Sequence, residues 1–358
     1  MTAAGTARDR AKTVTVIIPA YNAEATLAAC LEAIACSDRA PDEIIVFDDS
    51  STDTTDAVAT RFGARVINGS RGPRGPAFGR NAAARTAQSQ TLVFVDADVV
   101  VAPEAIGRLE RALIDGAASA AFGSYDDRPR SRRVAAFYYN LRHHWVHQRG
   151  RDEAFTFWSG LGAVDRDVFL LNGGFDPAYD KPSIEDVEFG IRIIEGGHRI
   201  RLVKDAQGSH CKDWTLRQLW HTDIVRRAIP WATLIRQGRG SADDLNISIS
   251  ERLTAVAAHL LWFFALAALV APVFLLLSVT ALMTYIWLNR NFHLFLLRKL
   301  PWTKAVGAIG LHWCYHLYAS VTYAVVRLMP EPVRHASAAR LPTRLRAEPT
   351  PPAPDTGP

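Results

Sequence analysis

The sequence has few cysteines, four in 358 residues, and their spacing fits neither a metal-binding motif nor a disulfide framework. A small secreted domain that depends on disulfides would have more cysteines at closer spacing. The pattern is therefore typical of a reduced compartment. We expect no functional role for the four residues, which are Cys30, Cys36, Cys211 and Cys314.

A secretory signal and a nucleic-acid-binding motif are also missing. Residues 1–12 are polar and charged, and the apolar stretch Val14–Pro19 is too short for the hydrophobic region of a signal peptide. We therefore expect the N-terminal domain to stay in the cytosol. The net charge of +5 is concentrated in the flanks of the apolar C-terminal third, which favours membrane lipids with anionic headgroups as the partner and no nucleic acid.

Long apolar runs are absent from the first two thirds of the chain and present in the last third. The nearly uncharged run Ala255–Leu288 would span about 50 Å as one helix, against a hydrocarbon core of about 30 Å. Because Pro272 lies near its middle, a hairpin of two short helices and one long kinked helix are both possible. A second run, Ala305–Leu328, is long enough to span once but contains two histidines. Basic residues flank both runs, so the position of the C-terminus stays open.

The first two thirds contain short apolar strands that alternate with helical patterns. Strands are predicted near residues 14–19, 43–47, 66–67 and 91–95. This alternation predicts an α/β fold with a largely parallel sheet, in which ligands bind at the carboxyl ends of the strands. The chain is thus divided into a disordered N-terminus (1–12), an α/β domain (13–220), an amphipathic interfacial linker (221–252), a transmembrane region of two or three helices (253–328) and a disordered tail (329–358).

Two carboxylates follow the fourth predicted strand, Asp96 and Asp98. Side chains alternate along a strand, so residues two apart face the same way. Two hard oxygen ligands at one point suit Mg²⁺ or Mn²⁺, which could hold a diphosphate. Taken alone, the pair is also compatible with two aspartates that cap a turn.

Six segments, in this order, carry a resemblance to a known family: VTVIIPAYN (14–22), VFDDSSTDTT (46–55), GPAFGRNAAA (75–84), FVDADV (94–99), GGFD (173–176) and IEDVEFGIR (184–192). Together they resemble family 2 glycosyltransferases with the GT-A fold, a Rossmann-like nucleotide-diphospho-sugar transferase fold. The resemblance covers about residues 13–215. The rest of the chain is similar to bacterial members with a C-terminal transmembrane segment.

The resemblance implies a donor site. It places Pro19, Tyr21 and Asn22 around the nucleotide, Asp49 on the base, and Arg80 on the diphosphate or nucleotide. Asp96 would contact the ribose or the metal, and Asp98 would hold the metal. The residues alone also permit an ordinary strand-to-helix turn at Tyr21, helix capping by Asp49 and a solvated arginine.

The resemblance also implies a catalytic pair, Glu185 and Asp186, in which the aspartate is the general base. The residues themselves offer a structural alternative, because Ser183 and Asp186 have capping-box spacing and Glu188 with Arg192 forms an i,i+4 ion pair. The structural and the catalytic interpretation are compatible if Asp186 lies at the start of a helix, because the helix would then also position its carboxylate.

Three further residues belong to this implied site. Gly160 and Trp158 match the acceptor side, and His210 would complete the metal shell. Alternatively, these residues form a tight turn, a core tryptophan and a hydrogen-bonded histidine. No third glycine follows Gly160 and Gly162 at the spacing of a dinucleotide fingerprint. Residues 217–220 do not reproduce the Gln-x-x-Arg-Trp motif of processive family members, which puts polymer synthesis in doubt.

A basic and aromatic stretch follows the α/β domain and includes Arg226, Arg227, Pro230 and Trp231. Its position shortly before the first apolar run predicts an interfacial helix. An ordinary helix with a solvated face is the alternative.

The sequence therefore predicts an inverting, metal-dependent glycosyltransferase of the cell envelope. It would transfer a sugar from a nucleotide-diphosphate sugar to a lipid-linked or membrane-proximal acceptor, with Mn²⁺ or Mg²⁺ as cofactor. We expect a multi-pass protein of the cytoplasmic membrane with its catalytic domain facing the cytosol. The alternatives are a polyprenyl-phosphate glycosyltransferase and an inactive, membrane-anchored module that binds nucleotide sugars.

Overall fold

The computed structural model describes residues 12–70, 72–115, 118–239 and 249–330. Contacts divide the chain into one unit that ends at Arg327 and a second that starts at Leu328. All elements below belong to the first unit, apart from the last residue of the final helix. The predicted N-terminus and most of the predicted tail lie outside the described residues.

Nine strands in the described part of the chain form one mixed sheet, in the order β3-β2-β1-β4-β8-β6-β9-β5, with β7 paired to β9. The first four strands are parallel to one another, and β8 runs antiparallel to both β4 and β6. The bounds are β1 Val14–Ala20, β2 Glu43–Asp48, β3 Arg65–Asn68, β4 Thr91–Val95, β5 Val99–Val101, β6 Ala120–Tyr125, β7 Glu153–Ala154, β8 Leu161–Asp165 and β9 Ile200–His210. The predicted α/β fold is confirmed, but the prediction of a largely parallel sheet is wrong, because β8 pairs antiparallel with β4 and β6, and β9 pairs antiparallel with β5 and β7.

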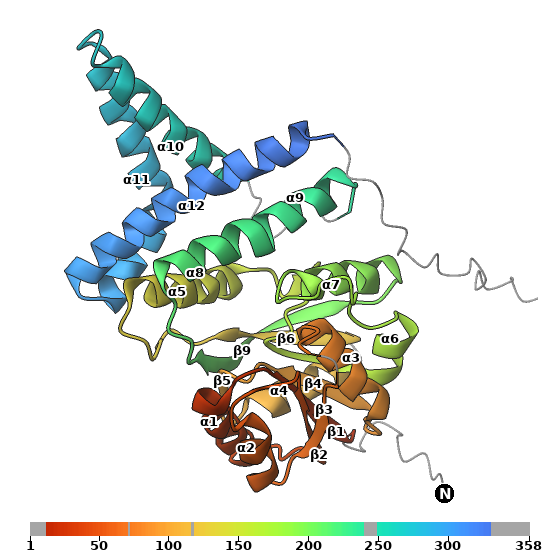
Figure 1. The fold of residues 1–358 in the computed structure, drawn as a ribbon. Helices are drawn as coiled ribbons and strands as arrows, with labels where there is room; N and C mark the ends of the chain where they lie inside the picture. Colours follow the sequence, from red (N-terminus) through yellow and green to blue (C-terminus); the bar gives the residue numbers. More distant parts are fainter. Residues whose placement is uncertain (1–11, 71, 116–117, 240–248, 331–358) are drawn as a thin grey trace, which may run out of the picture. The chain divides into compact units, whose positions relative to one another are not determined.

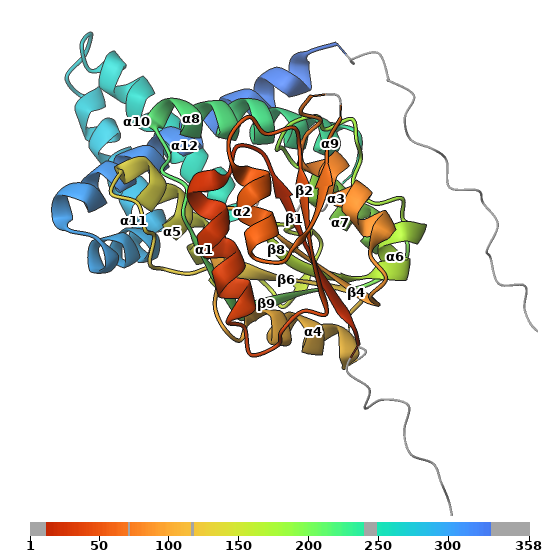
Figure 2. The ribbon, with the colours of Figure 1, turned by 60° about the horizontal axis from the view of Figure 1, so that its bottom comes forward.

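Helices cover both faces of this sheet (Figures 1 and 2). Val16 and Ile18 of β1 face a core with α1, α4 and α5, whereas Ile17 faces a core with α3, α6 and α7. Since successive side chains point to opposite faces, a strand buried on both sides must be apolar throughout, as the β1 run is. These helices span α1 Glu24–Ala35, α2 Thr55–Arg61, α3 Pro76–Thr86, α4 Ala105–Ile114, α5 Val134–Arg149, α6 Arg166–Leu171 and α7 Glu185–Glu195.

A longer helical run packs against α5 and contains a π-helical turn between two α-helices. It consists of α8 (Leu216–His221), a π-helical turn η1 (Thr222–Ala228) and α9 (Ile229–Arg236). The predicted interfacial stretch falls on η1 and α9. A π-helical turn inside a helix frequently marks a functional site.

The apolar C-terminal third forms three helices, α10 (Ile249–Ala267), α11 (Phe274–Lys299) and α12 (Trp302–Leu328). Of the two possibilities that Pro272 left open, the structure has the hairpin, with α10 and α11 packed side by side (Figure 1). Among the described helices, α10 alone is long and apolar enough by composition to cross a membrane, and few of its residues are buried.

Helix α12 packs along the α/β domain and the α8–α9 run. Tyr318 donates a hydrogen bond to Asp223 of η1 at 2.6 Å, and the Arg142 guanidinium of α5 lies 3.5 Å from the centre of the Tyr315 ring. Near the end of α12, Arg236 of α9 donates to the backbone oxygen of Val326 at 2.9 Å. One core therefore continues from the sheet into the C-terminal helices.

Candidate functional site

The carboxyl ends of β1 and β2 build one wall of the site. Asn22 follows β1 with a φ of 48°, and its side chain accepts a hydrogen bond from the backbone N–H of Thr52 at 2.8 Å. The buried Asp49 accepts from the backbone N–H groups of Arg74 and Gly75, at 2.9 and 2.7 Å. Asp49 therefore fixes the loop that opens α3, and the exposed Tyr21 lies at the rim.

Arg80 joins two of the predicted carboxylates. From α3, its Nη2 donates to Asp96 Oδ1 at 2.6 Å and its Nη1 to Glu185 Oε1 at 3.0 Å. The arginine and glutamate side chains are 4% and 5% exposed, so the solvated alternative for Arg80 is wrong. Glu185 also accepts from the backbone N–H of Ser183 at 2.8 Å. Burial and the nearby Asp186 raise the pKa of Glu185, while Arg80 opposes this shift.

Asp98 faces His210 across a short gap. His210 Nε2 lies 3.4 Å from Asp98 Oδ2, and its Nδ1 donates to Asn140 Oδ1 at 2.8 Å. With Nδ1 directed at Asn140, the ring presents Nε2 to a carboxylate oxygen, so a cation or a proton is favoured between the two groups. Burial alone would raise the pKa of Asp98. The nearby His210 and Lys212 have a larger effect in the opposite direction, so the pKa lies below its ordinary value.

The donor chemistry of Asp98 and His210 fits a divalent ion of the Mn²⁺ or Mg²⁺ type. Asp96 adds a second carboxylate, one oxygen of which is bonded to Arg80. Within the described residues, however, no group of three or more histidine, cysteine, aspartate or glutamate side chains is close enough to form a complete metal site. The predicted set of Asp96, Asp98 and His210 therefore remains a prediction.

Asp186 lies in the first turn of α7 and is oriented by the loop before β8. Its Oδ2 accepts from the backbone N–H and the hydroxyl of Ser159, at 3.1 and 3.2 Å, and its Oδ1 accepts from Val187 N at 2.8 Å. The side chain lines the cavity and is partly exposed. A carboxylate that is held beside a cavity can accept a proton from a hydroxyl group bound there, so the general-base role of Asp186 stays a prediction.

The predicted capping box at the start of α7 is wrong. The N-cap residue is Ile184, without a side-chain cap, and the hydroxyl of Ser183 donates to the backbone oxygen of Arg226 on η1 at 2.6 Å. The predicted ion pair is confirmed, with Arg192 Nη2 and Glu188 Oε2 at 2.8 Å. Ser183 thus connects the start of α7 to the π-helical turn.

Trp158 and Gly160 form the next part of the wall. Trp158 packs edge-on against Tyr125, with ring centroids 4.8 Å apart, and it lines the cavity. A Cβ atom on Gly160 would lie 2.5 Å from the Trp158 ring, so the glycine permits the indole to lie there. The structure therefore supports a requirement for glycine at this position.

These residues surround one cavity of about 1690 Å³ that continues past the predicted donor site. All of the predicted site residues line it except Gly160. Farther along, the wall is formed by the C-terminal helices, through Ala255, Val256, Leu260 and Phe263 of α10 and Ala319 and Tyr323 of α12. The cavity thus has a polar end at the sheet and an arm between the C-terminal helices. Polar side chains also line this arm, namely Glu251, Arg252, His259, His316 and Ser320, with His316 bonded to Glu251 and His259 to Ser320. The name apolar arm is used below for the part lined by Val256, Leu260 and Phe263.

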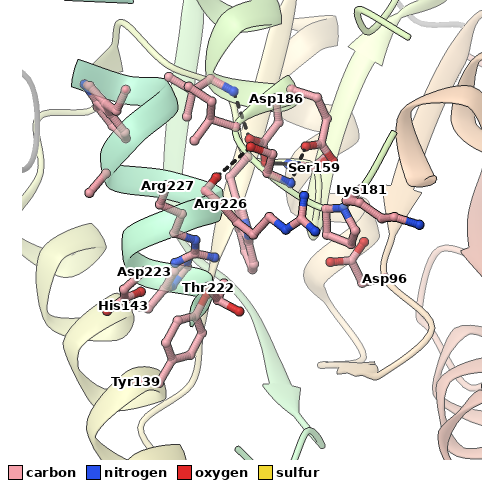
Figure 3. Close-up of a pocket in the computed structure, with 18 of the residues that line it drawn as sticks. Asp96, Tyr139, His143, Ser159, Lys181, Asp186, Thr222, Asp223, Arg226 and Arg227 are labelled. Atoms are coloured by element: carbon pink, nitrogen blue, oxygen red, sulfur yellow. Dashed lines mark hydrogen bonds between the residues drawn. The ribbon is translucent and has the colours of Figure 1, made fainter. Parts of the chain in front are cut away.

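The π-helical turn contributes residues that the sequence did not assign to the site. Thr222, Asp223, Arg226 and Arg227 of η1 all line the cavity, and Figure 3 shows Arg226 extending toward Lys181 and Asp96. The sequence predicts an interfacial helix at these arginines, which stays a prediction, and offers no local signal that they line the cavity. The contact between Ser159 and Asp186 was also missed, because no local pattern connects residues 27 positions apart.

Comparisons with known proteins agree with this geometry. Residues 15–169 match the model of Glycosyl transferase family 2. The chain is 24% identical over 189 residues to Glycosyltransferase GlyA of Streptococcus pneumoniae, which covers 52% of this chain and 27% of that protein. It is 35% identical over 98 residues to glucosyl-3-phosphoglycerate synthase of Mycobacterium tuberculosis, which covers 25% of this chain and 30% of the synthase. The chain thus spans less than a third of these curated relatives.

A solved structure is similar over a greater length. The mannosyltransferase PcManGT of Pyrobaculum calidifontis superposes with a TM-score of 0.51 at 21% identity, covering 88% of both chains. Such coverage extends beyond residues 15–169 and shows a shared fold. The ordered segments, the sheet with its acidic carboxyl-terminal edge and the matched family model establish that the α/β domain of this chain is a GT-A domain of glycosyltransferase family 2.

Proposed function

We propose that this protein is an inverting, metal-dependent glycosyltransferase that transfers a sugar from a nucleotide-diphosphate sugar to a lipid-linked acceptor. The observation that carries the proposal is the single cavity that joins Asp49, Asp96 and Asp186 to the apolar arm between α10 and α12. A soluble acceptor would not require an apolar arm of this kind. A donor at the polar end and a hydrocarbon chain in the arm would meet beside Asp186.

The donor would occupy the polar end. Pro19, Tyr21 and Asn22 would line the nucleotide, and Asp49 both shapes the loop before α3 and would bind the base. The mannosyltransferase that shares this fold was solved with GDP-mannose and Mn²⁺. We propose that Asp98 and His210, with Asp96, hold a divalent ion here. When bound, that ion would neutralise the charge that develops on the departing diphosphate.

The chain's own residues would then perform the proton transfer. Asp186, oriented by Ser159, would take the proton from the acceptor hydroxyl as its oxygen attacks the anomeric carbon. One displacement inverts that carbon. Arg80 would hold Asp96 in place, and Glu185 would act as a positioning residue through Arg80 instead of contacting substrate. Trp158 would face the acceptor.

We further propose that the protein associates with the cytoplasmic membrane, with the catalytic domain on the cytosolic side. Helix α10, the described helix with the composition of a membrane span, has 19 residues, about 28 Å, which approaches the hydrocarbon core of about 30 Å. The hairpin tip is apolar, and Leu269 and Val270 are 84% and 89% exposed. Because α12 packs along the catalytic domain, α10 and the part of α11 that pairs with it would form the membrane segment, whereas Phe292 and Leu296 of α11 pack in the core of the α/β domain.

The test uses purified full-length protein in a native lipid extract with a panel of nucleotide sugars, with and without Mn²⁺ or Mg²⁺. Metal-dependent release of one nucleotide, with its sugar recovered in the lipid phase, supports the proposal. Sugar bound through a phosphate, with no sugar primer, would favour the polyprenyl-phosphate alternative. Binding of several donors without turnover of any would favour the inactive binding module and overturn the proposal.

A further inference from the structure

The π-helical turn η1 lies where the two ends of the cavity meet. Five of its seven residues line the cavity, and residues of α10 and α12 continue the wall beyond it. In a π-helix the hydrogen bond joins residues five apart, so the turn is wider than in an α-helix. Thr222, Arg226 and Arg227, which are four and five residues apart, therefore face the cavity together.

The two arginines differ in their surroundings. The guanidinium of Arg227 lies 4.9 Å from the centre of the Tyr139 ring, near Asp223 (Figure 3). The guanidinium of Arg226 forms no hydrogen bond, ion pair or ring contact with any residue that the structure describes, and it extends into the cavity. Its backbone is fixed by the hydrogen bond from Ser183. A fixed backbone with an unpaired cation facing a cavity is suited to an anionic ligand.

The carboxylates nearest to η1 already have partners. Asp223 is buried and accepts from the hydroxyl of Tyr318 at 2.6 Å, and Asp186 accepts from Ser159. Asp96 is paired with Arg80. Arg226 therefore has no carboxylate of its own among the described residues, although several lie in the same cavity. An arginine fork matches the oxygens of a phosphate group, and two adjacent arginines can share one phosphate.

We infer that Arg226 and Arg227 form a binding subsite for the phosphate of an amphiphilic acceptor, a phosphate or diphosphate ester with a long hydrocarbon chain. The hydrocarbon lies along Val256, Leu260 and Phe263 of α10 and Ala319 of α12, and the accepting group points toward Asp186. This inference rests on the proposed function and adds the chemical class of the acceptor. Because α10 is apolar and largely unburied, the hydrocarbon chain of the acceptor can pass along it from the lipid phase into the arm.

The experiment compares Arg226→Gln with Arg217→Gln in the full-length protein. Arg217 lies on the preceding helix α8, is exposed and does not line the cavity, so it is a matched control for the same loss of charge. Binding is measured with fluorescent long-chain polyprenyl phosphate and with the corresponding uncharged polyprenol, both in phosphatidylcholine vesicles. Nucleotide-sugar affinity is measured separately in the presence of Mn²⁺.

The unmodified protein and Arg217→Gln are expected to prefer the polyprenyl phosphate at least tenfold over the polyprenol. Arg226→Gln is expected to lose this preference while nucleotide-sugar affinity stays within twofold. Equal binding of both lipids by the unmodified protein would overturn the inference. So would an Arg226→Gln variant with weakened nucleotide affinity and unchanged lipid binding, because Arg226 would then contact the donor diphosphate. Neither binding measurement requires turnover. A failure of the proposed reaction can therefore be distinguished from a failure of the phosphate subsite.

Discussion

Arg80 Nη2 and Asp96 Oδ1 are 2.6 Å apart, and the arginine side chain is almost completely buried. The same guanidinium also binds Glu185, so one cation on α3 connects the end of β4 to the start of α7. The residues that would hold the donor and those that would activate the acceptor are thus connected through a single side chain.

Removal of this cation is expected to destabilise the fold. Arg80→Met should lower the free energy of unfolding by about 3 kcal/mol, because a buried Glu185 would lose its partner. The measurement is denaturant unfolding in detergent. Arg85→Met, an exposed change on the same helix, is the control and should have little effect. Adding Glu185→Gln to Arg80→Met should recover part of the loss, and additive losses would contradict the account.

The metal assignment makes a separate prediction. Asp98→Ala is expected to abolish metal-dependent donor binding and to leave the fold intact, because the carboxylate faces His210 and is partly exposed. Titration calorimetry of a nucleotide sugar with and without Mn²⁺ measures the effect. Asp205→Ala, at an exposed carboxylate on β9, should bind normally. An unchanged metal titration in Asp98→Ala would remove the assignment.

The general-base role predicts a defect in turnover without a defect in donor affinity. Asp186→Asn keeps the size of the side chain but cannot take a proton, so kcat should fall about 10²- to 10⁴-fold. Steady-state kinetics and donor binding on the same preparation test this. Asp167→Asn, at an exposed carboxylate, is the control. A fall of less than tenfold would contradict the base role and would indicate that the acceptor phosphate itself attacks.

His147 predicts a loss of stability in acid. Burial lowers its pKa to about 4, although its hydrogen bond to Gly123 opposes this shift. An unfolded histidine titrates near 6.5, so the unfolded chain takes up the proton first, and stability falls as the pH drops from 6.5 toward 4. The expected loss between pH 7 and pH 5 is about 2 kcal/mol.

Thermal unfolding as a function of pH measures this contribution. His147→Gln should have a shallower dependence between pH 7 and pH 5 than the unmodified protein. His198→Gln, at a partly exposed histidine outside the cavity, should retain the original dependence. Identical pH profiles for His147→Gln and the unmodified protein would show that the histidine does not titrate as described.

The packing of α12 predicts membrane topology. Because Tyr318 and Tyr315 contact the catalytic domain, a cysteine placed at the C-terminal end of α12 should be labelled from the same side as one in the catalytic domain. Sealed vesicles and a membrane-impermeant maleimide measure this. A cysteine at Leu269, at the hairpin tip, should be protected. Labelling of the α12 cysteine from the opposite side would contradict the proposed arrangement.

The first four strands, the fold class and most of the polar end of the cavity were predictable from sequence, whereas β5 to β9 were not predicted. Apolar runs such as the one in β1 identify strands buried on both faces, and carboxylates that follow those runs must meet at one edge of the sheet. Asp49, Asp96 and Asp98 line the cavity as this reasoning requires, whereas Asp186, at the start of α7, was expected there only from the family resemblance.

Contacts across long sequence separations were not predictable. Arg80 and Glu185 are 105 residues apart, and no periodicity connects them. The π-helical turn leaves no signature in composition, so the position of Arg226 and Arg227 in the cavity wall was not predictable. Ser183 had the spacing of a capping box, but tertiary packing directed its hydroxyl to η1 instead. In each case, tertiary contacts decided among several locally reasonable interpretations.

The central claim is that the lipid acceptor reaches the donor site through the apolar arm. The most direct test is to block this arm with a large side chain. Ala319→Trp would fill the arm from α12, whereas Val321→Trp places the same side chain at an exposed position of that helix that does not line the cavity. Transfer of labelled sugar into the lipid phase and hydrolysis of the donor are measured together. We predict that Ala319→Trp loses at least tenfold in lipid product, with donor hydrolysis within twofold of the Val321→Trp control. Unchanged lipid product in Ala319→Trp would contradict the claim that the acceptor reaches the donor site through this arm.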